Sequence, residues 1–220
     1  MHMHYNVPYP SSTAQESGDP VSFFHTSATD LIFTPKDPTV HKPITTELLL
    51  NKKLRWVTLG GQYDWTNKVY PSNEPPAFPA DIKKLIEEIF TVKAEAAIVN
   101  LYSPGDTLSL HRDVSEECDR PLLSISLGCE GIFIAGLDEL DEEGSPRVAT
   151  MRLRSGDAVV MSDRSRYAWH GVPKVLEGTC PEWMQEWPWL GTGEERGVDE
   201  RWKGWMTGKR INLNVRQMFA

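Results

Sequence analysis

The chain has 220 residues, of which 40% are hydrophobic and 25% are charged, and its formal net charge is −8. These values are typical of one globular domain with a substantial core, and the acidic balance does not favour a protein coated with basic charge for nucleic acid. No apolar run approaches the roughly 18–20 residues that a membrane-spanning helix needs, so we expect no membrane partner.

The N-terminal 43 residues are rich in Ser, Thr and Pro and are expected to form an extended, poorly ordered arm. They contain no apolar stretch of the kind found in secretory signals. Three cysteines, an odd number without C-x-x-C spacing, favour reduced and buried thiols over disulfides or a zinc site: Cys118, Cys129 and Cys180. We therefore expect an intracellular protein, with the nucleus, the cytoplasm and the mitochondrion left open.

From residue 44 to residue 220 the pattern predicts one folded domain. A helical turn is expected from Thr45, and a longer amphipathic helix is expected after Pro79. Five apolar side chains of that helix recur at i, i+3, i+4, i+7 and i+8, namely Ile82, Leu85, Ile86, Ile89 and Phe90. We expect this face to pack on a sheet.

After the helix, short apolar runs alternate with turns rich in Gly, Pro and Asp. Eight strands are expected, at 96–102, 107–112, 122–127, 132–135, 148–154, 158–162, 169–175 and 210–219. This order predicts a mainly β fold with flanking helices (α+β), a two-sheet sandwich of the jelly-roll type. The acidic stretch 138–143 is expected to be a hairpin loop.

Three groups of basic residues interrupt the acidic sequence. On the usual exposure of charged side chains, each is expected to be solvated surface rather than a track for phosphates. The groups are Lys52, Lys53 and Arg55; Arg147, Arg152 and Arg154; and Arg164 and Arg166.

The residues with the clearest chemistry are His111 and Asp113. On an extended chain these two side chains point the same way, while Arg112 points oppositely. Two histidines and one carboxylate suit a non-haem Fe(II) oxygenase. His170 is the only other histidine in the strand-rich region, so it is the expected third ligand.

The last expected strand reads Arg210-Ile-Asn-Leu-Asn-Val-Arg216 and sorts by alternation into an apolar face and a polar face. The polar face contains Asn212 and both arginines, and such a face is common on a strand that is exposed to solvent. If it faces the interior, the two guanidinium groups need anions. A dicarboxylate co-substrate supplies carboxylates that arginine binds through its planar fork.

Together these motifs resemble the AlkB family of oxygenases, and within it the eukaryotic branch called AlkB homologue one. The resemblance covers residues 54–219. It rests on Leu54-Arg-Trp-Val-Thr-Leu-Gly60, Ala97-Ile-Val-Asn-Leu-Tyr-Ser-Pro-Gly-Asp-Thr-Leu-Ser-Leu-His111, Pro121-Leu-Leu-Ser-Ile-Ser-Leu-Gly128, Ser155-Gly-Asp157 and the run 210–217. After Asp113 come Val114 and Ser115, so the further acidic residue of the bacterial founder is absent. Its alkyl-lesion specificity therefore cannot be carried over.

The resemblance implies a double-stranded β-helix with a nucleotide-recognition lid at 55–75. A Trp-rich insertion at 176–208 precedes the last strand; we expect it to pack on itself, with contact to nucleic acid as the alternative. The resemblance also implies Fe(II) on His111, Asp113 and His170, with 2-oxoglutarate and O₂ as co-substrates. Five further residues fall on positions around the co-substrate and the metal carboxylate. Arg210 pairs with the distal carboxylate and Tyr102 assists it, while the others are Asn100, Asn212 and Arg216.

The implied activity is oxidative demethylation of a methylated DNA or RNA base, namely N6-methyladenine in DNA or a methylated tRNA base, with release of succinate, CO₂ and formaldehyde. Tyr63, Trp65 and Tyr70 of the lid either stack on the base or pack the lid on the sandwich. Two alternatives stay open: an oxygenase of the same chemistry acting on histone or another protein, and a non-catalytic nucleic-acid-binding module. Sequence gives no oligomeric state, and a monomer is the default.

Overall fold

The computed structural model describes residues 4–6, 8, 22–26, 28–62, 75–114, 118–189 and 197–218. The chain divides into two compact units. One consists of residues 1–55 and 182–207, and the other consists of residues 56–181 and 208–220. The second unit holds every residue of the site described below.

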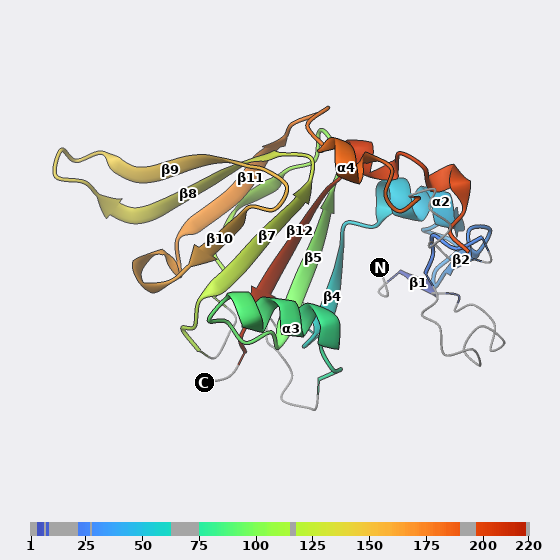
Figure 1. Cartoon of the computed structure of the whole chain (residues 1–220), viewed down its shortest axis with the longest axis horizontal. Coiled ribbons are helices and arrows are strands. Elements are labelled where there is room, and N and C mark those ends of the chain that lie inside the picture. The colour runs from blue at the N-terminus through green and yellow to red at the C-terminus, as the bar shows by residue number, and fades with distance from the viewer. Residues whose placement is uncertain are drawn as a thin grey trace. The chain divides into compact units, whose positions relative to one another are not determined.

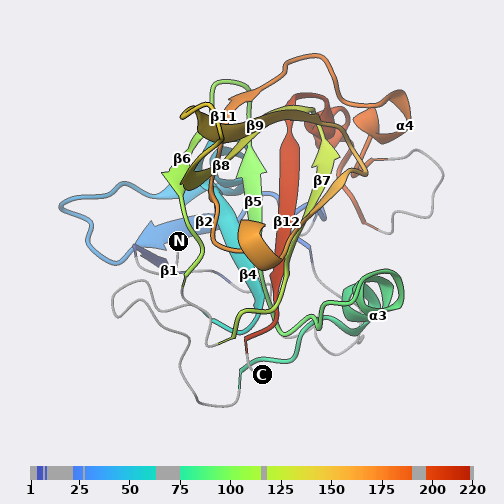
Figure 2. The same ribbon diagram turned by 90° about the vertical axis from the view of Figure 1, so that its left-hand side faces the viewer.

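The second unit contains two antiparallel sheets. A five-stranded sheet has the order β10-β7-β12-β5-β4, and a four-stranded sheet has the order β6-β11-β8-β9. The first is built from β4 (Trp56–Gly60), β5 (Ala96–Tyr102), β7 (Leu122–Gly128), β10 (Ala158–Met161) and β12 (Arg210–Arg216). The second is built from β6 (Leu108–His111), β8 (Gly131–Leu140), β9 (Pro146–Leu153) and β11 (Trp169–Val175). Figure 2 shows β8, β9 and β11 crossing in front of β5 and β12, as expected for a jelly roll.

Each of the eight strands expected from the sequence is present, and two of them, β5 and β11, have the expected bounds. A further strand, β4, lies where the start of the lid was expected, and it pairs with β5 along its whole length. The acidic stretch 138–143 is only partly a loop, because β8 continues to Leu140 and the turn occupies residues 141–145. Asp138 and Glu139 therefore belong to a strand.

The helix α3 (Ala80–Ile89) lies across the outer side of the five-stranded sheet (Figure 1). Ile86 is buried against Leu123 of β7 and Val215 of β12, and Ile82 and Phe90 pack against the same cluster. Leu85 and Ile89 are mostly exposed, which corrects the expectation that all five recurring apolar side chains face the sheet. One i, i+4, i+8 row is enough to cover this part of the sheet.

Between the two sheets lies a second apolar cluster. Phe133 of β8, Val172 of β11 and Leu122 of β7 are buried in it. The strands alternate, so every second residue enters this interior. The polar side chains of β12 also enter this interior, and apolar packing does not explain why they are buried there.

The first unit contains the sheet β1-β2-β3, formed by β1 (Tyr5–Asn6), β2 (Ile32–Pro35) and β3 (Ile44–Thr45). Two of these strands lie in the range expected to be an extended arm, and Phe33 of β2 is fully buried. The expected helical turn is confirmed as α2 (Thr46–Leu48), because the Thr45 hydroxyl accepts a hydrogen bond from the Leu48 amide. A π-helical turn follows at Leu49–Lys53.

The Trp-rich insertion contributes α4 (Glu182–Gln185) and the 3₁₀ turns Glu200–Trp202 and Trp205–Gly208. Its tryptophans do not pack only on one another. Trp187, Trp202 and Trp205 surround Phe24, with ring centroids 5.1–5.5 Å from the Phe24 ring. The insertion therefore shares a core with residues near the N-terminus, which the sequence pattern did not predict.

In the part of the chain that the structure describes, every helix is too short or too polar to reach from one side of a membrane to the other.

Candidate functional site

A cavity of about 460 Å³ opens between the two sheets of the second unit. That volume falls in the range of small-molecule sites, roughly 300–1,000 Å³. The five-stranded sheet contributes a polar wall, with Asn100 of β5 and the alternate residues of β12. The four-stranded sheet contributes an apolar wall, with Leu108, Phe133 and Val172, which is interrupted by two histidines.

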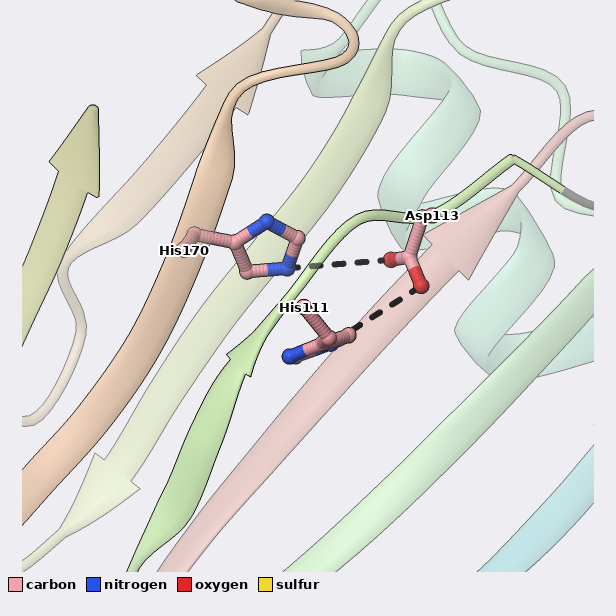
Figure 3. Close-up of side chains that lie close together, drawn as sticks. All are labelled: His111, Asp113 and His170. Carbon is pink, nitrogen blue, oxygen red and sulfur yellow. Dashed lines mark ion pairs between the residues drawn. The ribbon is translucent and has the colours of Figure 1, made fainter. Parts of the chain in front are cut away.

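His111, Asp113 and His170 come together on this cavity, from β6, from the segment just after β6, and from β11 (Figure 3). Their ligand atoms all lie within 4.8 Å of one another. The Nε2 atom of each imidazole is 3.9 Å from a carboxylate oxygen of Asp113. The two histidines are direct cross-strand partners in the β6–β11 register, which is why their ring centroids are only 4.3 Å apart.

A bulge makes this pairing possible. Between the pairs His170↔His111 and Val172↔Leu108, β6 contains one residue more than β11. Gly171 sits opposite the extra residue, and a Cβ atom there would lie 2.8 Å from the Leu108 carbonyl oxygen. The bulge lets Leu108 and His111 both face the cavity, which simple alternation would forbid.

Both imidazoles are oriented by their own strands. Nδ1 of His111 is 2.9 Å from the Ser109 carbonyl oxygen, and Nδ1 of His170 is 3.0 Å from the Ala168 carbonyl oxygen. A carbonyl can only accept, so each Nδ1 carries the proton and donates, and each Nε2 presents its lone pair toward Asp113. Burial, with His111 nearby, lowers the pKa of His170 below its ordinary value, which keeps it neutral.

The Asp113 carboxylate is held from β12. Nη2 of Arg216 donates to it at 2.7 Å and the Asn214 side-chain amide donates to it at 3.2 Å. Burial alone would raise the pKa of Asp113, but the Arg216 guanidinium and the two imidazoles outweigh burial and hold that pKa below its usual value. The carboxylate is therefore ionised and turned toward the histidines.

At the other end of β12, Arg210 is buried, and no carboxylate among the described residues pairs with it. Its exposed fraction is 1%, and Nη2 donates to the Ser126 hydroxyl at 2.9 Å. Nε and Nη1 have no hydrogen-bond partner among the described residues, and the same holds for the hydroxyl of Tyr102, whose ring lies 5.5 Å from the guanidinium. Burial lowers the pKa of Arg210. Burial also raises the pKa of Tyr102 to about 12, so the Tyr102 hydroxyl keeps its proton at neutral pH and can donate it in a hydrogen bond.

The expected co-substrate residues are thus brought to one place. Asn100, Arg210, Asn212 and Arg216 line the cavity, and Tyr102 is the cross-strand partner of Arg210. The side-chain amide of Asn212 donates to the Ser124 hydroxyl at 2.7 Å and to the Ile125 carbonyl at 3.2 Å, which fixes the direction of its own carbonyl oxygen.

Sequence reasoning missed two contributors, Asn214 and Ser126. Asn214 was visible on the polar face of the last strand but had no assigned partner. Ser126 lies opposite Asn212 in the β7–β12 register, and no spacing within β7 reveals that its hydroxyl meets Arg210. Tyr63, Trp65 and Tyr70 of the lid lie outside the described residues.

These features fit a ferrous ion and a keto diacid. The donor set, two imidazoles whose Nε2 atoms face one ionised carboxylate, is the set that leaves open positions on non-haem Fe(II). The unsatisfied donors of Arg210 and Tyr102 match one carboxylate of a small dicarboxylate, since buried donors without partners are costly. Leu108, Phe133 and Val172 make part of the remaining cavity wall apolar, which disfavours water there.

Comparison with known proteins agrees with this chemistry. The 2OG-Fe(II) oxygenase superfamily matches residues 21–216. The "N6-methyladenosine RNA demethylase ALKBH" of Cryphonectria parasitica is 50% identical over 99% of this chain and 99% of its own length. The "N6-methyladenosine RNA demethylase ALKB1" of Pyricularia oryzae is 51% identical over 99% of this chain, which spans 65% of that relative. A solved structure, described as that of OsALKBH1, shares the fold with a TM-score of 0.56 and 22% identity, covering 74% of this chain and 77% of that one.

The fold, the donor set and these matches define an Fe(II)- and 2-oxoglutarate-dependent dioxygenase that uses O₂. Within the 2OG-Fe(II) oxygenase superfamily, the chain belongs to the AlkB family.

Proposed function

We propose that this dioxygenase removes N-methyl groups from nucleic-acid bases, with His111, Asp113 and His170 as the ligands of Fe(II). The observation that carries the proposal is the meeting of three ligand atoms within 4.8 Å, in the same cavity as Arg210, whose Nε and Nη1 have no partner among the described residues. A metal site and a carboxylate site side by side are what a keto acid chelated to iron requires.

In this proposal 2-oxoglutarate places its distal carboxylate on Arg210 and Tyr102, and Asn100 and Asn212 border the chain between its two ends. When bound, iron and the keto acid supply the oxidation: O₂ gives one oxygen atom to succinate and the other to the N-methyl carbon, and CO₂ leaves. The resulting N-hydroxymethyl group loses formaldehyde, which returns the base nitrogen to N–H.

The protein's own part is positioning. Arg216 and Asn214 hold the Asp113 carboxylate ionised and in one orientation, and the Ser109 and Ala168 carbonyls fix the imidazole tautomers. Leu108, Phe133 and Val172 keep the space beside the metal apolar, which protects the reacting carbon from competing water chemistry.

For the base itself, we propose N6-methyladenine in RNA as the preferred substrate, because that is the activity in the names of the two fungal relatives that match half of the residues. N6-methyladenine in DNA and a methylated tRNA base are the two competing substrates. We further propose that the enzyme acts as a monomer inside the cell, in the nucleus or the cytoplasm. The three buried cysteines are thiols rather than disulfides, which is consistent with a reducing compartment there.

The test is a single-substrate comparison. Protein loaded anaerobically with Fe(II) and 2-oxoglutarate is mixed with O₂ and one of four matched substrates: RNA or DNA oligonucleotides carrying N6-methyladenine, methylated tRNA, or methylated histone peptide. Formaldehyde and succinate are then counted. Equal amounts of both products on RNA support the proposal. Formaldehyde from the peptide alone identifies a protein oxygenase, and absence of metal uptake identifies a non-catalytic module.

A further inference from the structure

Arg166 is buried although its neighbour Arg164 is not. The sequence pattern grouped the two as solvated surface, and for Arg166 that expectation is wrong, because its exposed fraction is 2%. Arg164 has an exposed side chain that pairs with Glu139 of β8. A buried guanidinium is costly unless its donors are used, so its contacts identify its role.

Two donors of Arg166 bind backbone carbonyl oxygens of one segment. Nη1 donates to the Asp113 carbonyl at 2.9 Å, and Nε donates to the Arg120 carbonyl at 2.7 Å. These two residues stand at opposite ends of the connection from β6 to β7. The ring of Tyr167 covers the guanidinium, whose central carbon lies 4.8 Å from the ring centroid.

Asp113 needs such a restraint. β6 ends at His111, so the backbone of Asp113 lies beyond the last residue that pairs with β11. Its carboxylate is tied to Arg216 and Asn214. Side-chain contacts alone leave the backbone free to rotate the carboxylate away from the imidazoles, whereas a hydrogen bond to the Asp113 carbonyl removes that freedom.

Arg166 also belongs to the segment that orients the second histidine. It follows the 3₁₀ turn Asp163–Ser165, which is closed by a capping box between Ser162 and Ser165. Two residues later, the Ala168 carbonyl accepts the hydrogen bond from Nδ1 of His170. A stretch of five residues therefore fixes the direction of one imidazole and the backbone of the carboxylate residue.

We infer that Arg166 is a positioning residue that couples the two halves of the metal site, by holding the backbone of Asp113 to the segment before His170. The inference rests on the proposed role of Asp113 as a metal ligand. Its distinctive consequence concerns metal affinity: outer partners that orient ligands change that affinity by about 10- to 100-fold.

The experiment measures Co(II) binding to the metal-free protein, followed through the visible absorption of the bound ion, for wild type, Arg166→Met, Arg166→Lys and the matched control Arg164→Met. Arg166→Met should bind Co(II) about 10- to 100-fold more weakly and with an altered spectrum. Arg166→Lys should recover part of the affinity, because an ammonium can reach one carbonyl but not both. Arg164→Met should stay within about twofold, because exposed ion pairs contribute little.

Thermal melting of the same metal-free proteins separates positioning from general stability. Arg166→Met leaves the Asp113 and Arg120 carbonyls without this donor, so its melting temperature should fall by a few degrees. It should still be folded at the temperature of the binding assay, where its Co(II) affinity falls. If its Co(II) affinity equals that of wild type, or if Arg166→Lys matches Arg166→Met, the inference is overturned. If wild type itself takes up no Co(II), the proposed function fails instead, which is a distinguishable result. Should Arg166→Met not fold, Arg166→Gln replaces it, since an amide can serve a single carbonyl.

Discussion

The two arginines at the ends of β12 have different surroundings, although both side chains are almost completely buried. Arg216 donates to the Asp113 carboxylate at 2.7 Å, so its charge is balanced within the chain. Arg210 meets a hydroxyl and an aromatic ring, and two of its donors have no partner among the described residues. β12 therefore carries an arginine paired with a carboxylate at one end, and at the other end an arginine with no carboxylate partner among the described residues.

This difference separates two uses of a buried charge. The Arg216–Asp113 pair lies within the protein itself, and under the proposed function it keeps the carboxylate ionised and oriented for iron. Under the proposed function, the Arg210 guanidinium binds an anion that comes from outside the protein, and its burial is unfavourable until that anion binds. Gly131 makes this arrangement possible, since a Cβ atom there would lie 2.7 Å from Nε of Arg210.

The largest effect should come from removing the carboxylate that Arg216 holds. Asp113→Ala should lower turnover by more than about a thousandfold, because a ligand worth several kcal/mol is lost. Turnover is measured as formaldehyde released from RNA that carries N6-methyladenine. Asp113→Asn, which keeps the shape of the side chain but loses its charge, serves as the comparison. Turnover within tenfold of wild type in Asp113→Ala would remove Asp113 from the metal site.

Methionine variants of Arg216 and Arg210 test whether the two buried arginines contribute differently to stability. Arg216→Met should lower the free energy of unfolding of the metal-free protein by at most about 3–5 kcal/mol, because it removes the guanidinium that balances the half-buried Asp113 carboxylate and leaves only the Asn214 amide as a donor among the described residues. Arg210→Met should leave that free energy unchanged or raise it, because no carboxylate in the described chain loses a partner. Urea unfolding of both variants measures the difference. Equal losses would mean that the two arginines do the same work.

Binding of 2-oxoglutarate should give Arg210 the carboxylate partner that Arg216 already has in the wild-type protein. With Mn(II) present, 2-oxoglutarate at about 100 times its dissociation constant should stabilise wild type by about 2.7 kcal/mol. Arg210→Lys should need about 10- to 100-fold more 2-oxoglutarate for the same rise in melting temperature, because an ammonium cannot replace the planar fork. A wild-type response in Arg210→Lys would place the distal carboxylate elsewhere.

The smallest change concerns Tyr102. Tyr102→Phe removes one hydrogen bond worth about 1 kcal/mol, so the KM for 2-oxoglutarate should rise about fivefold. Because burial raises the pKa of Tyr102 to about 12, the hydroxyl carries its proton below the ordinary pKa of 10 and loses it only as the pH rises toward about 12. The ratio of KM values between Tyr102→Phe and wild type should therefore be the same at pH 6.5 and pH 8.5. A ratio that falls over this interval would show that the phenol already titrates.

Much of the second unit could be predicted from local pattern. Short apolar runs between turns rich in Gly, Pro and Asp located the eight strands. His111, Asp113 and His170 stood out because few histidines lie among those strands. The register between strands could not be predicted in this way. The contacts of Ser126 with Arg210 and of Asn214 with Asp113 arise from pairings between strands far apart in sequence, and these are fixed only when the sheets assemble.

Arg166 shows the limit of composition more directly. Charged residues are usually exposed, so its grouping with Arg164 was reasonable. What distinguishes the two is the 3₁₀ turn, whose geometry directs Arg164 outward to Glu139 and Arg166 inward to two carbonyls. In the first unit the same difficulty arises with Phe24, whose tryptophan partners come from more than 160 residues away.

The bulge opposite Gly171 sets the spacing of the two imidazoles with very little tolerance. A Cβ atom on Gly171 would lie 2.8 Å from the Leu108 carbonyl oxygen. Because that oxygen belongs to the backbone, the clash could be relieved only by moving β6 and β11 apart. A residue with any side chain at this point would act as a wedge between β6 and β11, and His111 would move away from His170. The spacing of His111 and His170 in the proposed metal site thus depends on a glycine at residue 171.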